Sequence, residues 1–428
     1  MTEPQQHTGS YYAATRNQTS RYPQLQGDQS ADVCVVGAGF TGVSAALHLV
    51  ERGYKVTLVE ANRVGWGASG RNGGQMIGGL SGESAIAKSL STKGAEGESV
   101  LWDLRWAGHK IIRDRVATYN IDCDLKSGYL DLAIKPRHLN DLHAELEMLD
   151  RYQFPHEYRM LSQQETQDLT GTDAYIGAML NMGNGHLHPL NLCAGEAAAA
   201  VSLGATLYEQ SPVMRIERGA KARVVTELGS VTADFVVLAG NAYHFIEPKL
   251  RGLMFPVNSF IIASEPLSPE LVKQINPSDL ALCDPNYILE YFRLSADKRL
   301  LFGRRFTYFG SDPEVIKRNL IPHVLKKYPQ LANTKFDYGW GGTIGVPINR
   351  VPQMGRLAPN IIYSQGYSGH GVNVTHLAGQ IMADTVAGTL ERFDIFANIK
   401  PVTIPGQHLF RNQMVALGML YYKLVDSL

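Results

Sequence analysis

The stretch from residue 32 to residue 60 reads DVCVVGAGFTGVSAALHLVERGYKVTLVE. It contains two short runs of apolar, β-branched residues, at 33–36 and 55–59, which predict buried strands. A helix is predicted between them, from about residue 40 to residue 51. The turn between the first strand and this helix has the spacing G-x-G-x-x-G, with glycines at Gly37, Gly39 and Gly42. This order of strand, glycine turn, helix and strand predicts a dinucleotide site.

The three glycines are needed for different physical reasons. Gly37 permits the tight turn, Gly39 lets the backbone approach a pyrophosphate, and Gly42 lets the helix lie close to the strand. At the helix start, Phe40 and Thr41 contribute N–H groups and partial positive charge. The start of this helix is therefore the expected phosphate-binding point.

The second strand ends at Glu60, which is followed by Ala61. A carboxylate in this place can accept hydrogen bonds from a ribose diol. It would also repel a 2′-phosphate, so NADP is disfavoured. The motif by itself does not distinguish FAD from NAD.

Two further glycine-rich segments read GASGRNGGQ, at 67–75, and GYSGHGV, at 366–372. The first can wrap a pyrophosphate with backbone N–H groups, although a flexible surface loop is the alternative. The second lies between a predicted strand and a predicted helix, and a helix N-terminus stabilises the negative charge of a reduced flavin. A second such helix start favours FAD. The candidate cofactor residues in these segments are Gly67, Ala68, Ser69, Arg71, Asn72, Gly73, Gly74, Gln75, Gly366, Ser368, Gly369, His370, Gly371 and Val372.

The composition bounds the function classes. The chain has 428 residues, which favours two domains, and its 40 basic and 40 acidic residues give no reason to expect nucleic acid or an anionic membrane as partner. Its 4 cysteines are far apart and form no metal motif or disulfide framework. No secretory signal and no apolar run long enough for a spanning helix is found, so a cytoplasmic protein is expected.

Periodicity predicts the other elements. Helices are expected at residues 100–119, 137–152, 189–204, 312–328 and 371–387. Strands are expected at residues 129–134, 213–216, 222–226, 231–238, 286–294, 300–302 and 361–363. Residues 1–30 form a polar leader, which tyrosines at 11, 12 and 22 can hold to the surface.

The chain resembles the D-amino-acid oxidase superfamily of FAD enzymes, the group that contains glycine and sarcosine oxidases. The segments that carry the resemblance are 10–14, 32–37, 68–75, 185–192, 238–243, 365–372 and 375–379. The resemblance implies an α/β (α+β) fold, with a Rossmann-like FAD-binding domain and a noncontiguous, mixed-sheet substrate domain. The FAD-binding domain would gather 1–80, 159–245 and 337–400, and the substrate domain 81–158 and 246–336; residues 401–428 would be a C-terminal helical extension.

The resemblance also implies roles for single residues. The main chain of Val213 would contact the adenine, Gly240 would lie in the FAD site, and Gly74 and Gln75 would lie at the isoalloxazine ring. Some relatives tether FAD through a cysteine, but none of the cysteines falls between residues 340 and 372. Noncovalent FAD is therefore expected.

One departure from the superfamily bears on the substrate. Members that oxidise α-amino acids commonly hold the substrate carboxylate with an arginine, and the spacing from Trp340 puts Ile344 in that place. A buried carboxylate against isoleucine would stay unpaired. An amine without an adjacent carboxylate fits better, whereas Arg350 is a fallback anchor for the amino-acid alternative.

The strand expected at residues 286–294 would put Tyr287 and Tyr291 on one face. That face could form an aromatic wall for an amine, or the segment could be an ordinary half-buried strand. Arg304 and Arg305, on the next strand, are expected to be a solvated pair, with binding of a glutamyl carboxylate as the alternative. The catalytic candidates are Gln75, His370, Tyr287 and Tyr291, and a structural role in its turn is the alternative for His370.

The resemblance implies FAD-dependent oxidation of a primary amine to an imine and then an aldehyde, and a free or γ-glutamylated polyamine such as γ-glutamylputrescine is the implied substrate. The electrons would pass to O2 or another acceptor, and the protein would be a monomer or a homodimer. The alternatives are an oxidase or dehydrogenase of α-amino or N-methyl-amino acids and a non-catalytic flavoprotein with redox-dependent binding. Residues near the C-terminus could form an apolar helix face, namely Leu409, Phe410, Met414, Val415, Leu417, Leu420 and Tyr421. This face is expected to pack on the protein's own core rather than on a membrane.

Overall fold

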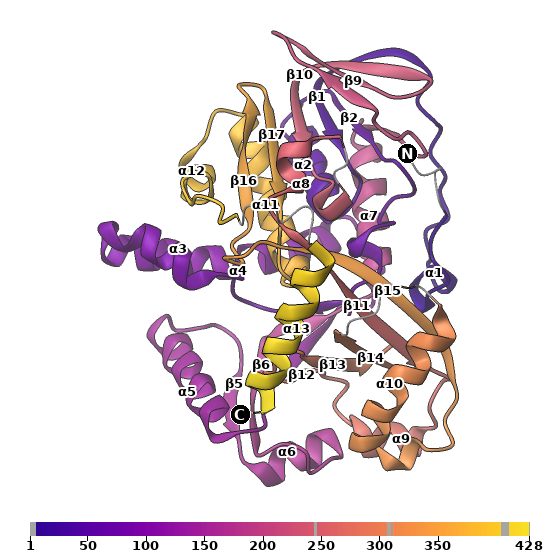
Figure 1. The fold of residues 1–428 in the computed structure, drawn as a ribbon, viewed down its shortest axis with the longest axis vertical. Coiled ribbons are helices and arrows are strands. Elements are labelled where there is room, and N and C mark those ends of the chain that lie inside the picture. The colour runs from indigo at the N-terminus through magenta and orange to yellow at the C-terminus, as the bar shows by residue number, and fades with distance from the viewer. Residues whose placement is uncertain (1–5, 244–245, 306–309, 311, 404–410, 428) are drawn as a thin grey trace.

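The computed structural model describes residues 6–243, 246–305, 310, 312–403 and 411–427. Its strands form two separate sheets, one in the upper half and one in the lower half of Figure 1. Both sheets combine parallel and antiparallel pairs, so the predicted mixed α/β fold with a Rossmann-like half is confirmed.

The first sheet is built around β1 (Gly27–Val36), which pairs in parallel with β2 (Val56–Val59) and with β10 (Gly229–Leu238). The order is β16-β17-β10-β1-β2-β7, and β9 and β8 continue from β10. The strands not yet given are β7 (Thr206–Tyr208), β8 (Arg215–Glu217), β9 (Ala222–Val225), β16 (Gln353–Ala358) and β17 (Ile361–Gln365).

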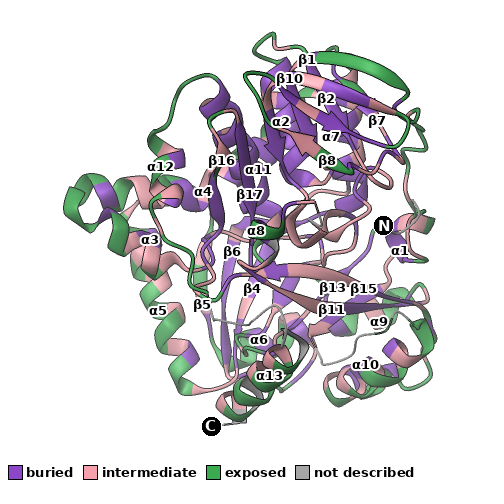
Figure 2. Ribbon diagram, turned by 45° about the horizontal axis from the view of Figure 1, so that its top comes forward, coloured by how far each residue is buried: buried purple, intermediate pink, exposed green. Residues whose placement is uncertain are grey.

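Both faces of the first sheet are covered, which is why its central strands are continuously apolar. Val33 and Val35 pack with residues of α2 (Phe40–Val50), α7 (Pro189–Ser202) and α11 (Gly371–Val386). Cys34 and Val36 face the opposite side and pack with residues of β9 and β10. Figure 2 shows these central strands and helices as buried.

The second sheet has the order β15-β11-β14-β13-β12-β4-β6-β3, and β5 pairs with β6. One of its faces packs under α10 (Pro313–Lys327), in a core that contains Phe260, Phe292 and Phe302. Its strands are β3 (Gln75–Met76), β4 (Lys126–Ala133), β5 (Tyr158–Leu161), β6 (Gly177–His186), β11 (Phe255–Ser264), β12 (Ala281–Cys283), β13 (Glu290–Leu294), β14 (Leu300–Arg305) and β15 (Phe336–Val346).

The residue ranges of the two domains stay a prediction. β6 and β15 fall within ranges expected for the FAD-binding domain, yet both pair in the second sheet. The helices not yet given are α1 (Tyr11–Ala14), α3 (Glu83–Leu90), α4 (Ala95–Thr118), α5 (Pro136–Arg151), α6 (Gln163–Thr170), α8 (Pro248–Arg251), α9 (Pro269–Ile275), α12 (Glu391–Ala397) and α13 (Arg411–Ser427). The predicted helices thus correspond to α4, α5, α7, α10 and α11.

The strand predicted at residues 286–294 is too long, because β13 begins only at Glu290. The Asp284 carboxylate accepts the N–H groups of Asn286 and Glu290. The Asp426 carboxylate, from α13, accepts those of Tyr287 and Ile288 at 2.9 Å each. Side chains thus occupy backbone donors that a strand ladder would need, and residues 286–289 form a loop.

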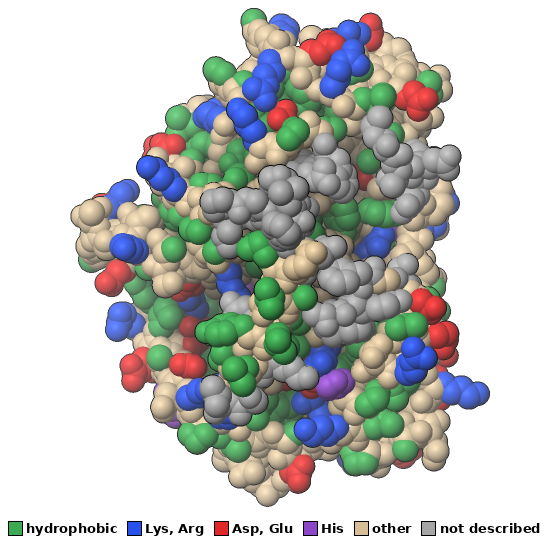
Figure 3. Space-filling model, in the orientation of Figure 1, with side chains coloured by type: hydrophobic (Ala, Val, Ile, Leu, Met, Phe, Trp, Pro, Cys, Tyr) green, Lys and Arg blue, Asp and Glu red, His purple; other side chains and the backbone are tan. Residues whose placement is uncertain are grey.

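The C-terminal helix is present, but its apolar face is not packed on the core as expected. Leu417, Leu420, Tyr421 and Leu424 are 61–66% exposed, and hydrophobic side chains are visible over α13 in Figure 3. Leu409 and Phe410, which were expected to join this face, lie outside the described residues. In the part of the chain that the structure describes, no helix is both long enough and apolar enough to cross a bilayer.

Candidate active site

A cavity of about 1340 Å³ lies between the turns of the first sheet and one face of the second sheet. It is lined by the turn after β1, by the loop 66–75, by the turn after β17, and by residues of β4, β12, β13 and β14. Pockets for a single small ligand usually measure about 300–1,000 Å³. This cavity is therefore large enough for a dinucleotide together with a small substrate.

The turn after β1 brings the start of α2 to the cavity wall. Gly39, the N-cap residue of α2, has no side chain to cap the helix, and the Phe40 N–H donates instead to Ser69 Oγ of the neighbouring loop at 2.9 Å. Gly42 lies behind the wall, where an added Cβ would overlap the carbonyl oxygen of Gly37. The close packing expected of Gly42 is present, and the uncapped N-terminus is open to an anionic group.

Glu60 marks the other end of this wall, at the end of β2. Its carboxylate accepts the N–H of Ala38 at 2.7 Å and the N–H of Asn62 at 2.8 Å. These bonds fix the carboxylate beside the cavity and leave lone pairs for further donors, such as a ribose diol. Val213 and Met214 line the same end.

The loop 66–75 lines the cavity and is held by hydrogen bonds within the loop, so it is not the free surface loop of the alternative. The Asn72 amide group donates to Ala68 O and Ser69 O, and its oxygen accepts the N–H of Gly74 at 2.8 Å. The guanidinium of Arg71 lies 4.3 Å from the ring centre of Trp66. The loop therefore presents its backbone to the cavity in one defined shape.

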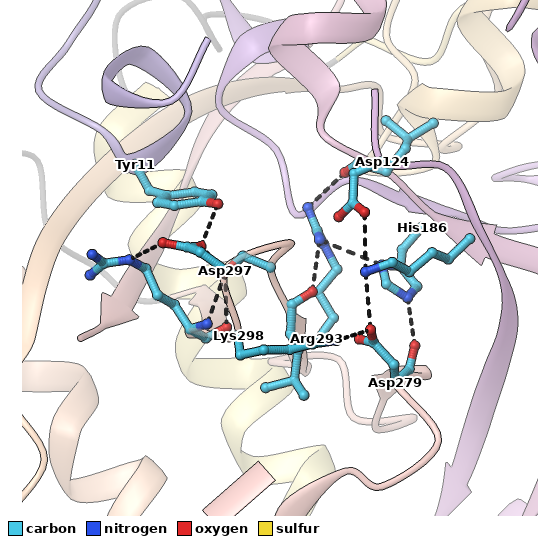
Figure 4. A network of polar contacts seen from close by, with 12 residues as sticks. Tyr11, Asp124, His186, Asp279, Arg293, Asp297 and Lys298 are labelled. Carbon is cyan, nitrogen blue, oxygen red and sulfur yellow. Dashed lines mark hydrogen bonds and ion pairs between the residues drawn. The ribbon is translucent and has the colours of Figure 1, made fainter. Parts of the chain in front are cut away.

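Arg293, from β13, ties this loop to the second sheet, and Figure 4 shows its guanidinium near His186. Its buried guanidinium donates to Gly73 O at 2.8 Å, to Leu187 O at 2.6 Å and to Leu294 O at 3.0 Å. Burial and the Arg293 charge lower the pKa of His186 to about 3, so this neighbouring imidazole is neutral at pH 7. Arg293 thus acts as a cationic clamp on three carbonyl groups.

Figure 4 also shows how the N-terminal leader is anchored near this clamp. The Tyr11 hydroxyl donates to Asp297 Oδ1 at 2.7 Å, and the carboxylate of Asp297 accepts from Arg299 as well. The Tyr12 ring is fully buried. The leader is therefore held to the second sheet through these two tyrosines.

The start of α11 meets the start of α2 at the cavity. The hydroxyls of Thr41 and Tyr367 share a hydrogen bond at 2.7 Å, and no side chain caps α11. His370, at the start of α11, borders the cavity and its side chain is exposed there; desolvation by the surrounding cavity walls and then the nearby arginines lower its pKa to about 4. It is therefore a neutral imidazole at pH 7.

Two uncapped helix starts from distant parts of the chain thus face one cavity, and this arrangement fits the phosphates and the ring of FAD. Of the candidate cofactor residues, only Gly42, Gly74 and Gly366 do not line the cavity. Those that do are Gly37, Gly39, Phe40, Thr41, Glu60, Ala61, Gly67, Ala68, Ser69, Arg71, Asn72, Gly73, Gln75, Val213, Gly240, Ser368, Gly369, His370, Gly371 and Val372.

The second sheet supplies the opposite wall. Tyr291 lies against Gly73, and its hydroxyl shares a hydrogen bond with Ser259 Oγ at 2.9 Å. Tyr287 lines the cavity from the loop before β13 rather than from the strand. Ile344 is also on the wall, at the place expected for a carboxylate-binding arginine.

The expectation of a solvated arginine pair is wrong for Arg305. Arg304 points away from the cavity and pairs with Glu290 at 2.9 Å, whereas Arg305 lines the cavity together with Arg350. Burial, and then the Arg350 charge, lowers the pKa of Arg305. Among the described residues, Arg305 forms no ion pair, so its charge is available to a ligand.

Sequence reasoning missed Tyr129 and Asp131 on β4 and Cys283 on β12, which also line the cavity. Their strands were predicted in part, and alternation puts Tyr129 and Asp131 on one face. Nothing in the sequence alone says which face meets the cavity.

The sequence profile of the FAD-dependent oxidoreductase family matches residues 32–385. The chain is 42% identical to gamma-glutamylputrescine oxidoreductase of Escherichia coli (strain K12), with 100% of both chains covered. Two solved structures share its fold. The glycine oxidase from Geobacillus kaustophilus has a TM-score of 0.69 and 21% identity, covering 85% of this chain and 98% of its own. The L-amino acid deaminase from Proteus vulgaris has a TM-score of 0.72 and 18% identity, covering 90% and 98%.

The profile match spans most of the chain, and the cavity has the glycine-lined, uncapped helix starts that the cofactor needs. The protein belongs to the FAD-dependent oxidoreductase family.

Proposed function

We propose that this enzyme oxidises the terminal primary amine of γ-glutamylputrescine or of a closely related γ-glutamyl amine. The observation that carries the proposal is the 42% identity, over the complete length of both chains, to a relative named for that substrate. The cavity supports it, because Ile344 stands where α-amino-acid oxidases commonly hold an arginine.

We further propose that the glycine turns and Glu60 hold FAD without a covalent bond. Bound FAD supplies the two-electron acceptor for oxidation of the carbon next to the substrate nitrogen. The chain's own residues line the cavity: the α2 start and loop 66–75 would hold the diphosphate, and the α11 start and Tyr291 would lie at the ring and the substrate. Neutral His370 adds no positive charge that would repel an ammonium group.

Arg305 and Arg350 are the proposed site of the glutamyl carboxylate. Both line the cavity, and the Arg350 guanidinium carbon lies 5.7 Å from the ring centre of Tyr287. The Arg350 charge disfavours the charged form of Arg305, and a bound carboxylate would offset this repulsion. A carboxylate held here belongs to the remote end of a conjugate.

An anaerobic panel of amines tests the proposed function. We expect γ-glutamylputrescine to bleach the visible flavin absorbance faster than putrescine, spermidine, glycine, sarcosine or D-alanine. Bleaching by sarcosine or D-alanine alone would refute the proposed substrate class. A flavin that none of these amines reduces would refute catalysis of amine oxidation.

Arg305→Gln is expected to lower kcat/KM for γ-glutamylputrescine roughly 30-fold, because a charge-assisted bond of about 2 kcal/mol is lost. N-acetylputrescine, which lacks the carboxylate, should react almost as before. Steady-state kinetics with both substrates gives the comparison.

Arg304→Gln is the matched control, since that guanidinium pairs with Glu290 instead of facing the cavity. It should leave the preference for γ-glutamylputrescine over N-acetylputrescine unchanged. Equal losses for both substrates in Arg305→Gln would contradict a role in carboxylate binding.

A further inference from the structure

Asp131 and Arg305 lie on the same face of the second sheet, on strands that are not neighbours. Asp131 belongs to β4, and the strand order puts β12 and β13 between β4 and β14. Leu130 and Leu132 point to the opposite face, into the core under α10, so alternation turns Asp131 toward the cavity. One side of the wall therefore carries an acidic side chain and the other a basic one.

The Asp131 carboxylate forms no hydrogen bond or ion pair with any residue that the structure describes. The titratable groups that face it are Glu145 from α5, Arg105 from α4, Cys283 from β12 and Tyr129 from its own strand. The Arg105 guanidinium already pairs with the carboxylates of Glu83 and Glu145. Asp131 thus lacks a cation of its own.

Burial, and then the negative charge of Glu145, raises the pKa of Asp131 to about 7. A carboxyl group with this pKa can both bind a cation and hold a proton near neutral pH. The substrate needs such a group, because with a pKa of about 10.4 only roughly one alkyl amine in 2,500 is neutral at pH 7.

We propose that Asp131 binds the ammonium group of the substrate and accepts its proton. One N–H bond of the ammonium breaks, an O–H bond forms on the Asp131 carboxylate, and a neutral amine with a free electron pair results. The inference rests on the proposed function and refines it. A substrate with an amine at one end and a carboxylate at the other would bind both Asp131 and Arg305. A free diamine has no carboxylate to pair with Arg305.

The pH profile of kcat/KM for γ-glutamylputrescine tests the proton transfer. In the wild type it should rise through about pH 7 and then stay level to about pH 10, near the pKa of the free amine. In Asp131→Asn it should be roughly 10- to 100-fold lower near pH 7 and climb toward the wild-type value at about pH 10. Asp131→Glu should restore a level region. A constant loss at every pH in Asp131→Asn would overturn the proposal.

Calorimetric binding to the FAD-loaded protein tests the cation site without turnover. The probes are γ-glutamylagmatine, which ends in a guanidinium, and γ-glutamylbutylamide, which ends in a methyl group. Asp131→Asn should weaken binding of the first roughly tenfold or more and leave the second unchanged. Equal weakening of both would overturn the proposal.

Asp284→Asn is the matched control for the binding measurement. Asp284 also lines the cavity and also has a pKa raised to about 7 by burial, but its carboxylate accepts backbone N–H groups of its own loop. Asp284→Asn should leave unchanged the affinity for γ-glutamylagmatine relative to that for γ-glutamylbutylamide. A relative affinity lowered as much as in Asp131→Asn would overturn the assignment to Asp131. A wild type reduced only by sarcosine or D-alanine refutes the proposed function itself, and this inference with it.

Discussion

Gly42→Ala is expected to abolish FAD binding. The new Cβ would overlap the carbonyl oxygen of Gly37, a backbone atom that cannot move without opening the turn after β1. Alanine is the better helix former by about 1 kcal/mol, but overpacking typically costs about 1–3 kcal/mol, and more where the overlap is with backbone that cannot move. The net effect of the substitution is therefore destabilising, and the turn after β1, which would face the diphosphate, is displaced.

The ratio of visible flavin absorbance to protein absorbance, measured after purification with excess FAD, gives the result directly. Gly418→Ala is the matched control, because Gly418 is also helical, in α13, and a Cβ there meets no atom within 4 Å. That variant should keep its FAD and lose no stability. A yellow Gly42→Ala protein with wild-type FAD affinity would contradict the proposed role of this turn.

Arg293→Met is expected to destabilise the protein by about 3–5 kcal/mol and to release FAD. The substitution leaves Gly73 O, Leu187 O and Leu294 O in the interior without their donor, and an unsatisfied buried acceptor costs about 1–3 kcal/mol. Gly73 borders the cavity, so the damage reaches loop 66–75.

Chemical denaturation of the apoprotein and FAD titration separate the two effects of Arg293→Met. Arg293→Lys should recover part of the stability, because an ammonium group reaches fewer of the carbonyls. Arg159→Met removes an exposed pair with Glu165 and should cost no more than about 1 kcal/mol. An Arg293→Met protein as stable as this control would show that the clamp contributes little.

The cofactor end of the site could be predicted from the sequence because its chemistry is local. The turn containing Gly37 and Gly39, the carboxylate of Glu60 and the helix start at Gly371 each lie within a short stretch. The backbone conformation of each stretch follows from its own residues. These predictions do not depend on which segments of the chain come together in the fold.

The substrate end could not be predicted in the same way. Arg305 and Asp131 stand on strands whose alternation was readable, but whether a face meets a cavity or a core depends on the helices that cover it. α10 covers the face of Leu130 and Phe302, and the other face is left to the cavity. The expectation of a solvated Arg305 failed for this reason.

The loop before β13 was predicted as a strand for a related reason. Asn286 to Leu289 have strand-like composition, but Asp426, more than a hundred residues away, accepts N–H groups of this segment. No local pattern in the sequence reports a side chain that arrives from the C-terminal helix.

A crystal structure of the FAD-loaded protein with γ-glutamylagmatine tests the central claim most directly. The account predicts one FAD between the starts of α2 and α11, with the glutamyl carboxylate at Arg305 and the guanidinium at Asp131. A ligand bound in the reverse direction, or an isoalloxazine ring outside the cavity that both helix starts share, would contradict it.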